Sequence, residues 1–215
     1  MTERYHLKLS RLVKELAGKL KIDDRRVIEA LSVVPRHAFV DEGIRVRAYT
    51  DDALPIGYGQ TISKLSTVLM MTAALDPRQG EKVLEVGTGS GYQAAVLGKL
   101  AAEVYSVERI AALAVKAQGV LNRIQVYNVR VRTGDGALGW PEAAPFDKII
   151  VTAAADSLPK TLLEQLSIGG KLVAPVGEGE GQMLRMVVRK AEDVWEEWDM
   201  NCCRFVPLVR NGINR

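Results

Sequence analysis

The chain has 215 residues, of which 47% are hydrophobic and 26% are charged. This balance predicts a globular protein with one well-filled core and excludes a disordered or fibrous chain. The formal charge of +3 comes from 29 basic and 26 acidic residues spread along the sequence, so no basic tract predicts binding to nucleic acid or an anionic membrane. No apolar run reaches the length of a membrane span, and residues 1–20 lack the apolar stretch of a signal peptide. We therefore expect a cytoplasmic protein with a single domain, residues 1–215.

The N-terminal region, residues 1–80, predicts helices and a loop on the substrate side of the molecule. Apolar residues recur at helical spacing in three stretches, residues 7–20, 27–34 and 67–75. Asp23 or Asp24 can cap the second of these helices, and Pro35 ends it. Residues 49–66 are rich in Gly, Pro, Asp, Thr and Ser and show no sustained period, which predicts a loop.

The pattern changes in the core region, residues 81–190, where short β-rich runs alternate with helical stretches. Such alternation predicts a doubly wound α/β fold with a mostly parallel, Rossmann-like sheet. The expected strands are residues 82–86, 103–107, 126–132, 148–152 and 171–176, and the expected helices are 92–100, 111–121 and 162–166. Two further strand-like segments, 183–189 and 195–206, leave no room for a crossover helix between them, which predicts an antiparallel addition at the sheet's edge. We expect residues 191–215 to supply the C-terminal strand and a substrate-groove segment.

The two cysteines, Cys202 and Cys203, are adjacent in one of these expected strands. Neighbouring side chains of a strand point to opposite faces, so the two thiols cannot easily form a disulfide. We expect a pair of buried thiols rather than a redox or metal site.

The first expected strand leads to its helix through Gly87-Thr88-Gly89-Ser90-Gly91. Three glycines let the backbone turn sharply and approach a ligand closely. Such a turn is a weak signal by itself. However, Tyr92 stands where a dinucleotide fingerprint would have its last glycine, and this departure weakens an NAD interpretation.

Acidic residues stand at or just after the ends of three successive strands, at Glu85, Glu108 and Asp135. They should converge, because the carboxyl ends of parallel strands meet at one edge of a sheet. Three carboxylates with no basic residue in the glycine turn would repel a pyrophosphate, but they suit an ammonium, a sulfonium, a ribose diol and an adenine. S-adenosyl-L-methionine carries these groups and no phosphate, so it is the expected cofactor, with S-adenosyl-L-homocysteine as product. The expected cofactor-binding residues are Glu85, Gly87, Thr88, Gly89, Ser90, Gly91, Glu108, Asp135 and Gly136.

Two of these acids have specific candidate roles. Glu108, about twenty residues past the turn, is placed to accept from the ribose hydroxyls. Its alternative role is a charge at a helix N-terminus near Arg109. Asp135 can accept from the adenine amino group, and its alternative role is an Asx turn.

After the fourth expected strand the chain reads Thr152-Ala153-Ala154-Ala155. Methyltransferases that act on amides or exocyclic amines commonly have an Asp/Asn-Pro-Pro-Tyr/Phe element there. Its absence favours a methyl acceptor that is nucleophilic by itself. A carboxylate is nucleophilic at neutral pH without a general base. Catalysis then consists of positioning and desolvation.

Motifs along nearly the whole chain resemble those of the protein-L-isoaspartate (D-aspartate) O-methyltransferase family. The motifs are Pro35-Arg36-His37-Ala38-Phe39-Val40, Leu54-Pro55-Ile56-Gly57, Gly59-Gln60-Thr61-Ile62-Ser63, residues 84–93 and Phe205-Val206-Pro207-Leu208. The resemblance implies transfer of a methyl group to the free carboxylate of L-isoaspartyl residues in damaged proteins and peptides. This methylation is the first step of protein repair through a succinimide.

The resemblance also implies roles for individual residues. Ser63 is the expected catalytic residue, hydrogen-bonded to the isoaspartyl carboxylate, and its alternative role is a helix cap. The expected substrate-binding residues are Thr61, Ile62, Ser63, Val206, Pro207 and Leu208. His37 is expected to be a structural hydrogen-bonding residue, since a carboxylate acceptor needs no base. Lys64-Leu65-Ser66 replaces a stretch in which the family usually has a proline, which leaves this loop less constrained.

Other functions stay open at this point. A methyltransferase for a small molecule or RNA is one alternative, although aromatic residues for stacking make up only 6% of the chain. A non-catalytic cofactor-binding module is another, and an NAD oxidoreductase is the most distant. We expect a monomer that takes isoaspartyl proteins and peptides as substrates, with no nucleic-acid, membrane or metal partner.

Overall fold

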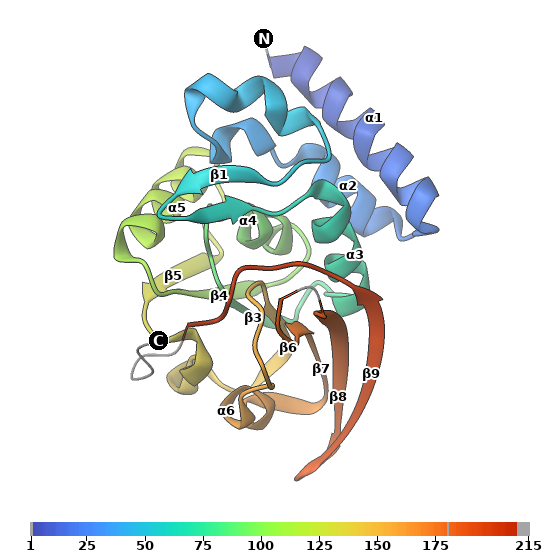
Figure 1. Ribbon diagram of the computed structural model, residues 1–215, viewed down its shortest axis with the longest axis vertical. Coiled ribbons are helices and arrows are strands. Elements are labelled where there is room, and N and C mark those ends of the chain that lie inside the picture. Colours follow the sequence, from blue (N-terminus) through green and yellow to red (C-terminus); the bar gives the residue numbers. More distant parts are fainter. Residues whose placement is uncertain (1, 180, 210–215) are drawn as a thin grey trace.

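The computed structural model describes residues 2–179 and 181–209, with the backbone alone for residues 2–4. Within these residues, the main sheet has seven strands in the order β5-β4-β3-β6-β7-β8-β9 (Figure 1). Its parallel part consists of β5 (Val129–Thr133), β4 (Glu103–Glu108), β3 (Lys82–Val86), β6 (Phe146–Val151) and β7 (Leu166–Val176). Strands β8 (Met183–Ala191) and β9 (Val194–Cys202) add to it antiparallel. The predicted α/β fold with an antiparallel edge is confirmed.

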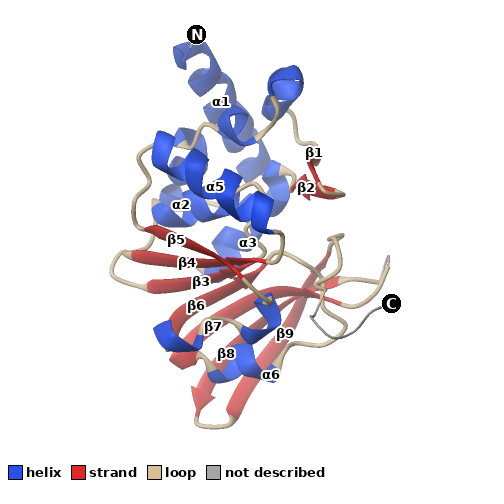
Figure 2. Ribbon diagram, turned by 90° about the vertical axis from the view of Figure 1, so that its left-hand side faces the viewer, coloured by secondary structure: helices blue, strands red, loops and turns tan. Residues whose placement is uncertain are grey.

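Helices cover both faces of this sheet. They are α1 (Thr2–Leu20), α2 (Arg25–Val33), α3 (Leu65–Leu75), α4 (Tyr92–Gly98), α5 (Ala111–Arg123) and α6 (Lys160–Glu164). Figure 2 shows α1, α2, α3 and α5 on one side of the sheet and α6 on the other. Successive side chains of β3 pack on opposite faces of the sheet. Val83 belongs to the core under α1–α5, and Leu84 belongs to the core that includes Leu162 of α6. No helix of the described chain is long and apolar enough to cross a bilayer.

The predicted helix ends are confirmed by their contacts. Asp24 caps α2 and accepts from the backbone nitrogens of Arg26 at 3.0 Å and Val27 at 3.4 Å. The helix ends at Val33, two residues before Pro35. Helix α3 begins at Leu65, two residues earlier than expected, and ends at Leu75.

The prediction of a loop over residues 49–66 is wrong in its middle. Strands β1 (Leu54–Gly57) and β2 (Gln60–Ile62) form a hairpin there. Its turn runs through Gly57, Tyr58 and Gly59, all at positive φ. Strands of three and four residues are too short to establish a period, so their pairing was not visible in the pattern. Two short 3-10 helices, Arg36–Phe39 and Glu42–Tyr49, precede the hairpin.

The prediction of two buried thiols is also wrong. Cys202 is exposed and Cys203 is half-buried, and both are free cysteines. The expected strand 195–206 ends at Cys202, because the chain then leaves the sheet toward Ala154, which bridges Pro207. Strand β9 is last in the order of the described strands and is exposed at most of its positions, Cys202 included. Partial burial raises the pKa of Cys203 to about 11.

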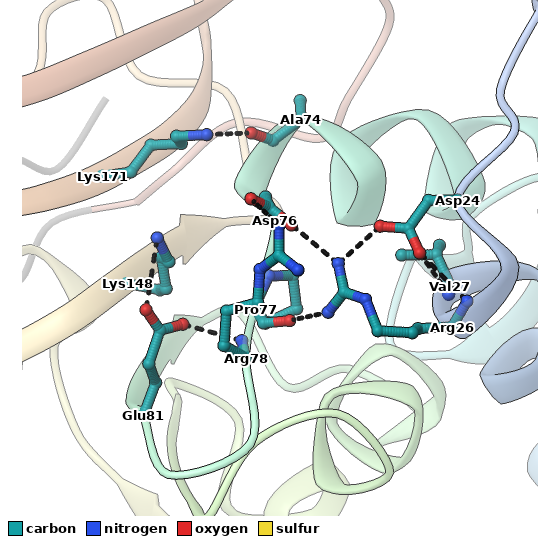
Figure 3. A network of polar contacts seen from close by, with 10 residues as sticks. All are labelled: Asp24, Arg26, Val27, Ala74, Asp76, Pro77, Arg78, Glu81, Lys148 and Lys171. Atoms are coloured by element: carbon teal, nitrogen blue, oxygen red, sulfur yellow. Dashed lines mark hydrogen bonds and ion pairs between the residues drawn. The ribbon is translucent and has the colours of Figure 1, made fainter.

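Charged residues join the elements at the edge where the sheet strands begin (Figure 3). Arg26 of α2 donates to Asp76 at 2.8 Å and to the carbonyl of Pro77 at 2.8 Å, just after α3. Lys148 of β6 pairs with Glu81 before β3 at 3.5 Å. This network ties α2 and α3 to the edge of the sheet opposite the glycine turn that follows β3.

Candidate active site

The turn after β3 has a backbone that glycine adopts most easily. Gly87, Gly89 and Gly91 have φ values of +99°, +53° and +88°. A Cβ on Gly87 would lie 2.5 Å from Thr152 Oγ1, and one on Gly91 would lie 3.1 Å from Ala117 Cβ. Both strain and lack of space therefore exclude larger residues at these two positions.

A pocket opens beside this turn and joins three separate parts of the chain. The first is the turn itself with the end of β4, residues 87–90 and 107–110. The second is the hairpin and the loop after it, residues 59–63. The third is the C-terminal segment, residues 205–209, which follows β9.

Most of the sequence-predicted site residues line this pocket. These are Thr61, Ile62, Ser63, Gly87, Thr88, Gly89, Ser90, Glu108, Gly136, Val206, Pro207 and Leu208. Glu85, Gly91 and Asp135 are outside its lining. Sequence reasoning missed the wall formed by Thr67, Val68 and Met71 of α3, although their helical spacing shortly after Ser63 was a usable signal. It also missed Gln93 of α4.

Glu108 is buried and supports the glycine turn. Its Oε2 accepts from the backbone nitrogen of Gly89 at 2.8 Å, and its Oε1 accepts from that of Ile110 at 2.9 Å. A carboxylate oxygen can accept more than one hydrogen bond. Glu108 can therefore hold the turn and still accept from a ligand's hydroxyls in the pocket.

Glu85 lies fully buried under the turn. Its Oε2 accepts from Ser106 Oγ, which lies 2.5 Å from the Thr88 hydroxyl, and its Oε1 has no hydrogen-bond partner. Burial is the main cause that raises the pKa of Glu85 to about 8. Glu85 is therefore largely protonated at pH 7, so the expectation of three anionic carboxylates overcounts the negative charge around the turn.

Asp135 begins a short 3-10 helix, Gly136–Leu138, directly after β5. Its Oδ1 accepts from the backbone nitrogen of Ala137 at 2.9 Å. One carboxylate oxygen of Asp135 thus has the turn-forming role that the sequence analysis gave as the alternative. Gly136, the next residue, lines the pocket.

Ser63 does not cap the helix that follows it. Helix α3 begins at Leu65 without a side-chain cap from the preceding residue. Asp51 takes that role from 15 residues upstream, because its Oδ1 accepts from the backbone nitrogen of Ser66 at 2.8 Å. This contact also constrains the loop that lacks the family's usual proline. Ser63 is left on the wall of the pocket.

Arg36 stabilises the Ser63 loop from inside the protein. Its guanidinium is fully buried and donates through Nη2 to the carbonyl oxygens of Ser63 at 2.8 Å and Asp52 at 3.0 Å. The same group lies 5.1 Å from the ring centroid of Tyr92, which lines the pocket. Sequence analysis placed Arg36 in a motif without a role.

His37 lies outside the pocket lining. Its Nδ1 is hydrogen-bonded to the hydroxyl of Tyr49, whose ring stacks on Tyr5 at 5.0 Å between centroids. Burial, with a smaller contribution from Arg45, lowers the pKa of His37. These contacts give His37 a structural role between α1 and the 3-10 segments.

The segment without acceptor side chains, residues 152–155, holds the C-terminal segment through its backbone. Ala154 donates to the carbonyl of Val206 at 2.8 Å and accepts from the backbone nitrogen of Leu208 at 2.6 Å. Thr152 donates to the carbonyl of Gly87 at 2.6 Å. This short stretch therefore connects the glycine turn to the opposite wall of the pocket.

A mostly parallel sheet, a Gly-x-Gly-x-Gly turn after β3 and an acid at the end of β4 define a Rossmann-like, S-adenosylmethionine-dependent methyltransferase. The particular family follows from its sequence model. The model described as protein-L-isoaspartate(D-aspartate) O-methyltransferase (PCMT) matches residues 7–212, and the chain belongs to this family.

Relatives and solved structures agree with this assignment. A protein-L-isoaspartate O-methyltransferase of Anaeromyxobacter dehalogenans is 52% identical, covering 89% of this chain and 93% of its own length. The same enzyme of Syntrophus aciditrophicus is 47% identical, with 97% of each chain covered. A solved protein-L-isoaspartate O-methyltransferase aligns with a TM-score of 0.84 at 27% identity, covering 94% of this chain and 66% of that longer chain.

A second solved structure shares the fold. It is described as a protein-L-isoaspartate O-methyltransferase of Plasmodium falciparum in complex with S-adenosyl-L-homocysteine. It aligns with a TM-score of 0.82 at 24% identity and covers 94% of this chain and 99% of its own.

Proposed function

We propose that this protein transfers a methyl group from S-adenosyl-L-methionine to the free carboxylate of L-isoaspartyl residues in damaged proteins and peptides. The observation that carries the proposal is that one pocket is lined by the glycine turn and Glu108 on one side and by Ser63 and the C-terminal segment on the other. Residues proposed to bind the cofactor and residues proposed to bind the acceptor therefore line one cavity in a member of the isoaspartate methyltransferase family.

The residues around the turn fit the proposed cofactor. The unpartnered Oε1 of Glu85 is a buried polar atom that would accept from a cationic donor once Glu85 is ionised. A nearby positive charge would favour the ionised form of Glu85. Glu108 would accept from the ribose hydroxyls, Asp135 would lie near the adenine, and residues 87–91 would contact the ligand through their backbone. Bound there, the sulfonium supplies a methyl group that a carboxylate can attack directly.

The acceptor side needs little chemistry from the protein. A carboxylate is already ionised at neutral pH, so no general base is required. Ser63 would donate a hydrogen bond to it, which holds one oxygen toward the methyl group and replaces water. Thr61, Ile62 and residues 206–208 would line the peptide's path, partly through backbone groups, which tolerates many sequences. The ester can lose methoxide, which is a far better leaving group than the oxide of an ionised carboxylate, so the peptide's own backbone nitrogen can then close a succinimide with release of methanol.

We infer further that residues 1–215 act as one domain, as a monomer in the cytoplasm and without nucleic acid. The hydrophobic core under α1–α5 supports one domain, since it contains buried residues from Leu9 of α1 to Leu184 of β8. The mixed charges along the chain support the absence of a nucleic-acid surface.

Transfer of labelled methyl from S-adenosylmethionine tests the function. An isoaspartyl peptide should be labelled, and the same peptide with normal aspartate should not. Equal labelling of both would contradict specificity for isoaspartate, and labelling of neither would contradict the proposed activity.

A further inference from the structure

The C-terminal segment of the pocket, residues 205–209, is held along both of its edges. On one edge its hydrogen bonds go to the backbone of Ala154. On the other edge they go to a side chain. Gln182, which lies just before β8 and is 5% exposed, accepts from the backbone nitrogen of Phe205 at 2.6 Å. It also donates through Nε2 to the carbonyl of Phe205 at 3.1 Å.

This pairing imitates a β-ladder with a side chain in place of a strand. The backbone nitrogen and carbonyl of one extended residue point the same way, and a primary amide offers one acceptor and one donor in the same plane. The backbone of Gln182 adds a third bond, because its carbonyl accepts from the nitrogen of Cys203 at 3.0 Å. The carboxamide of Gln182 meets both groups of Phe205 at once because it supplies one acceptor and one donor.

The segment also has open space on two sides. One side faces the active-site pocket. The other faces a second cavity, lined by residues 154–157, 177–179 and 207–209 together with Gln182 itself. The hydrogen bonds to Ala154 and Gln182 therefore add to the packing of Phe205 and Leu208 against the hydrophobic core in setting the position of this wall.

We propose that Gln182 is a positioning residue for the acceptor peptide. By holding Phe205 it sets the distance of residues 206–208 from Ser63 across the pocket. It acts through the segment and not on the reacting atoms, and the inference rests on the function proposed above. Loss of its two bonds should therefore weaken binding of the isoaspartyl peptide more than it slows methyl transfer or weakens cofactor binding.

Gln165 provides a matched control. It is 8% exposed and holds another loop with the same two bonds, accepting from the nitrogen of Trp140 at 2.8 Å and donating to the carbonyl of Leu138 at 2.9 Å. Neither bonded residue lines the active-site pocket. Gln165→Met and Gln182→Met remove equivalent bonds while preserving side-chain length.

Steady-state kinetics with an isoaspartyl peptide, calorimetry with S-adenosylhomocysteine and thermal melts should be run on wild type and both variants. We expect both variants to lower Tm. Only Gln182→Met should raise KM for the peptide, by about 10-fold, which is the size expected for loss of two hydrogen bonds. Its kcat and its affinity for S-adenosylhomocysteine should change by less than about 3-fold. An unchanged peptide KM, or an equal rise in Gln165→Met, overturns the proposal.

A second variant serves if Gln182→Met does not fold. Gln182→Glu has the same size, but when ionised it places an oxygen against the Phe205 carbonyl. Protonation restores the donor, and burial raises the pKa of such a group. The ratio of its peptide KM to that of wild type should therefore fall as pH is lowered from about 7.5 to 5.5. A ratio that does not change with pH overturns the proposal. The activity of wild type on the same peptide is the separate test of the proposed function.

Discussion

The guanidinium of Arg36 lies 2.8 Å from the carbonyl oxygen of Ser63 and has no exposed surface. No carboxylate of the described chain pairs with it at salt-bridge distance, and its Nε and Nη1 have no hydrogen-bond partner. A buried cation is therefore used to hold the backbone of one loop. That loop carries the proposed catalytic residue, Ser63. A substitution of Arg36 should therefore affect both the stability of the fold and the rate of methyl transfer.

Arg36→Lys should lower the free energy of unfolding by about 1–3 kcal/mol, because the shorter side chain and compact ammonium of Lys cannot keep both the carbonyl contacts of Nη2 and the contact of the guanidinium with the Tyr92 ring. Denaturant unfolding measures this change, and methyl transfer should fall with it. Arg45→Lys is the control, since Arg45 pairs with Glu42 at the surface. Its effect should stay below about 1 kcal/mol. Equal effects of the two substitutions would show that burial of Arg36 is unimportant.

Ser63→Ala should lower kcat/KM for an isoaspartyl peptide by about ten- to a hundred-fold, the loss of one hydrogen bond to a charged group. Affinity for S-adenosylhomocysteine should be unchanged, because Ser63 is proposed to touch only the acceptor. Ser66→Ala, in the first turn of α3, keeps the backbone bond to Asp51 and should leave both quantities near wild type. Equal losses in rate and cofactor affinity would instead place Ser63 in the cofactor site.

Glu108→Ala should weaken binding of S-adenosylhomocysteine by about 1.5–3 kcal/mol, the value of hydrogen bonds to a charged acceptor. Part of this loss would come from the turn, since the nitrogen of Gly89 loses its partner. Calorimetry measures the affinity, and circular dichroism checks that the fold is intact. Wild type should not bind NAD. An unchanged affinity of the variant for S-adenosylhomocysteine would show that Glu108 only holds the backbone of Gly89 and Ile110.

Glu85 should make stability depend on pH in the ligand-free protein. Its pKa rises from 4.5 when unfolded to about 8 when folded. A raised pKa means that its contribution is fully present below the unfolded value and is lost as pH increases toward about 8. The difference in unfolding free energy between wild type and Glu85→Gln should therefore move in favour of the variant from pH 5 to pH 8. A difference that is constant over this range would contradict the raised pKa.

The same group should release a proton when the cofactor binds. If the ammonium of S-adenosylhomocysteine lies near the unpartnered Oε1, its charge favours ionised Glu85. Calorimetry at pH 7 in two buffers with different ionisation enthalpies measures the number of protons released. Wild type should release a fraction of a proton, and Glu85→Gln should release less. Equal proton release by wild type and Glu85→Gln would show that Glu85 does not interact with the charge of the bound cofactor.

The sequence by itself determined the features that depend on residues close together in the chain. Apolar spacing predicted the alternating helices and strands of an α/β fold, and the Asp24 cap involves residues only two and three positions away. The glycine turn was visible because its backbone is set by local φ angles. Motif order was sufficient to indicate the family, which the family model matches over residues 7–212.

Only the tertiary structure decided the contacts between residues far apart in the chain. Asp51 caps α3 from 15 residues away, Arg36 reaches Ser63 across 27 residues, and Gln182 meets Phe205 across 23. No period or spacing encodes such pairs, because side-chain hydrogen bonds depend on where folding places both partners. The charge state of Glu85 has the same origin: its pKa depends on how completely neighbouring elements exclude water, and burial is a property of the folded chain.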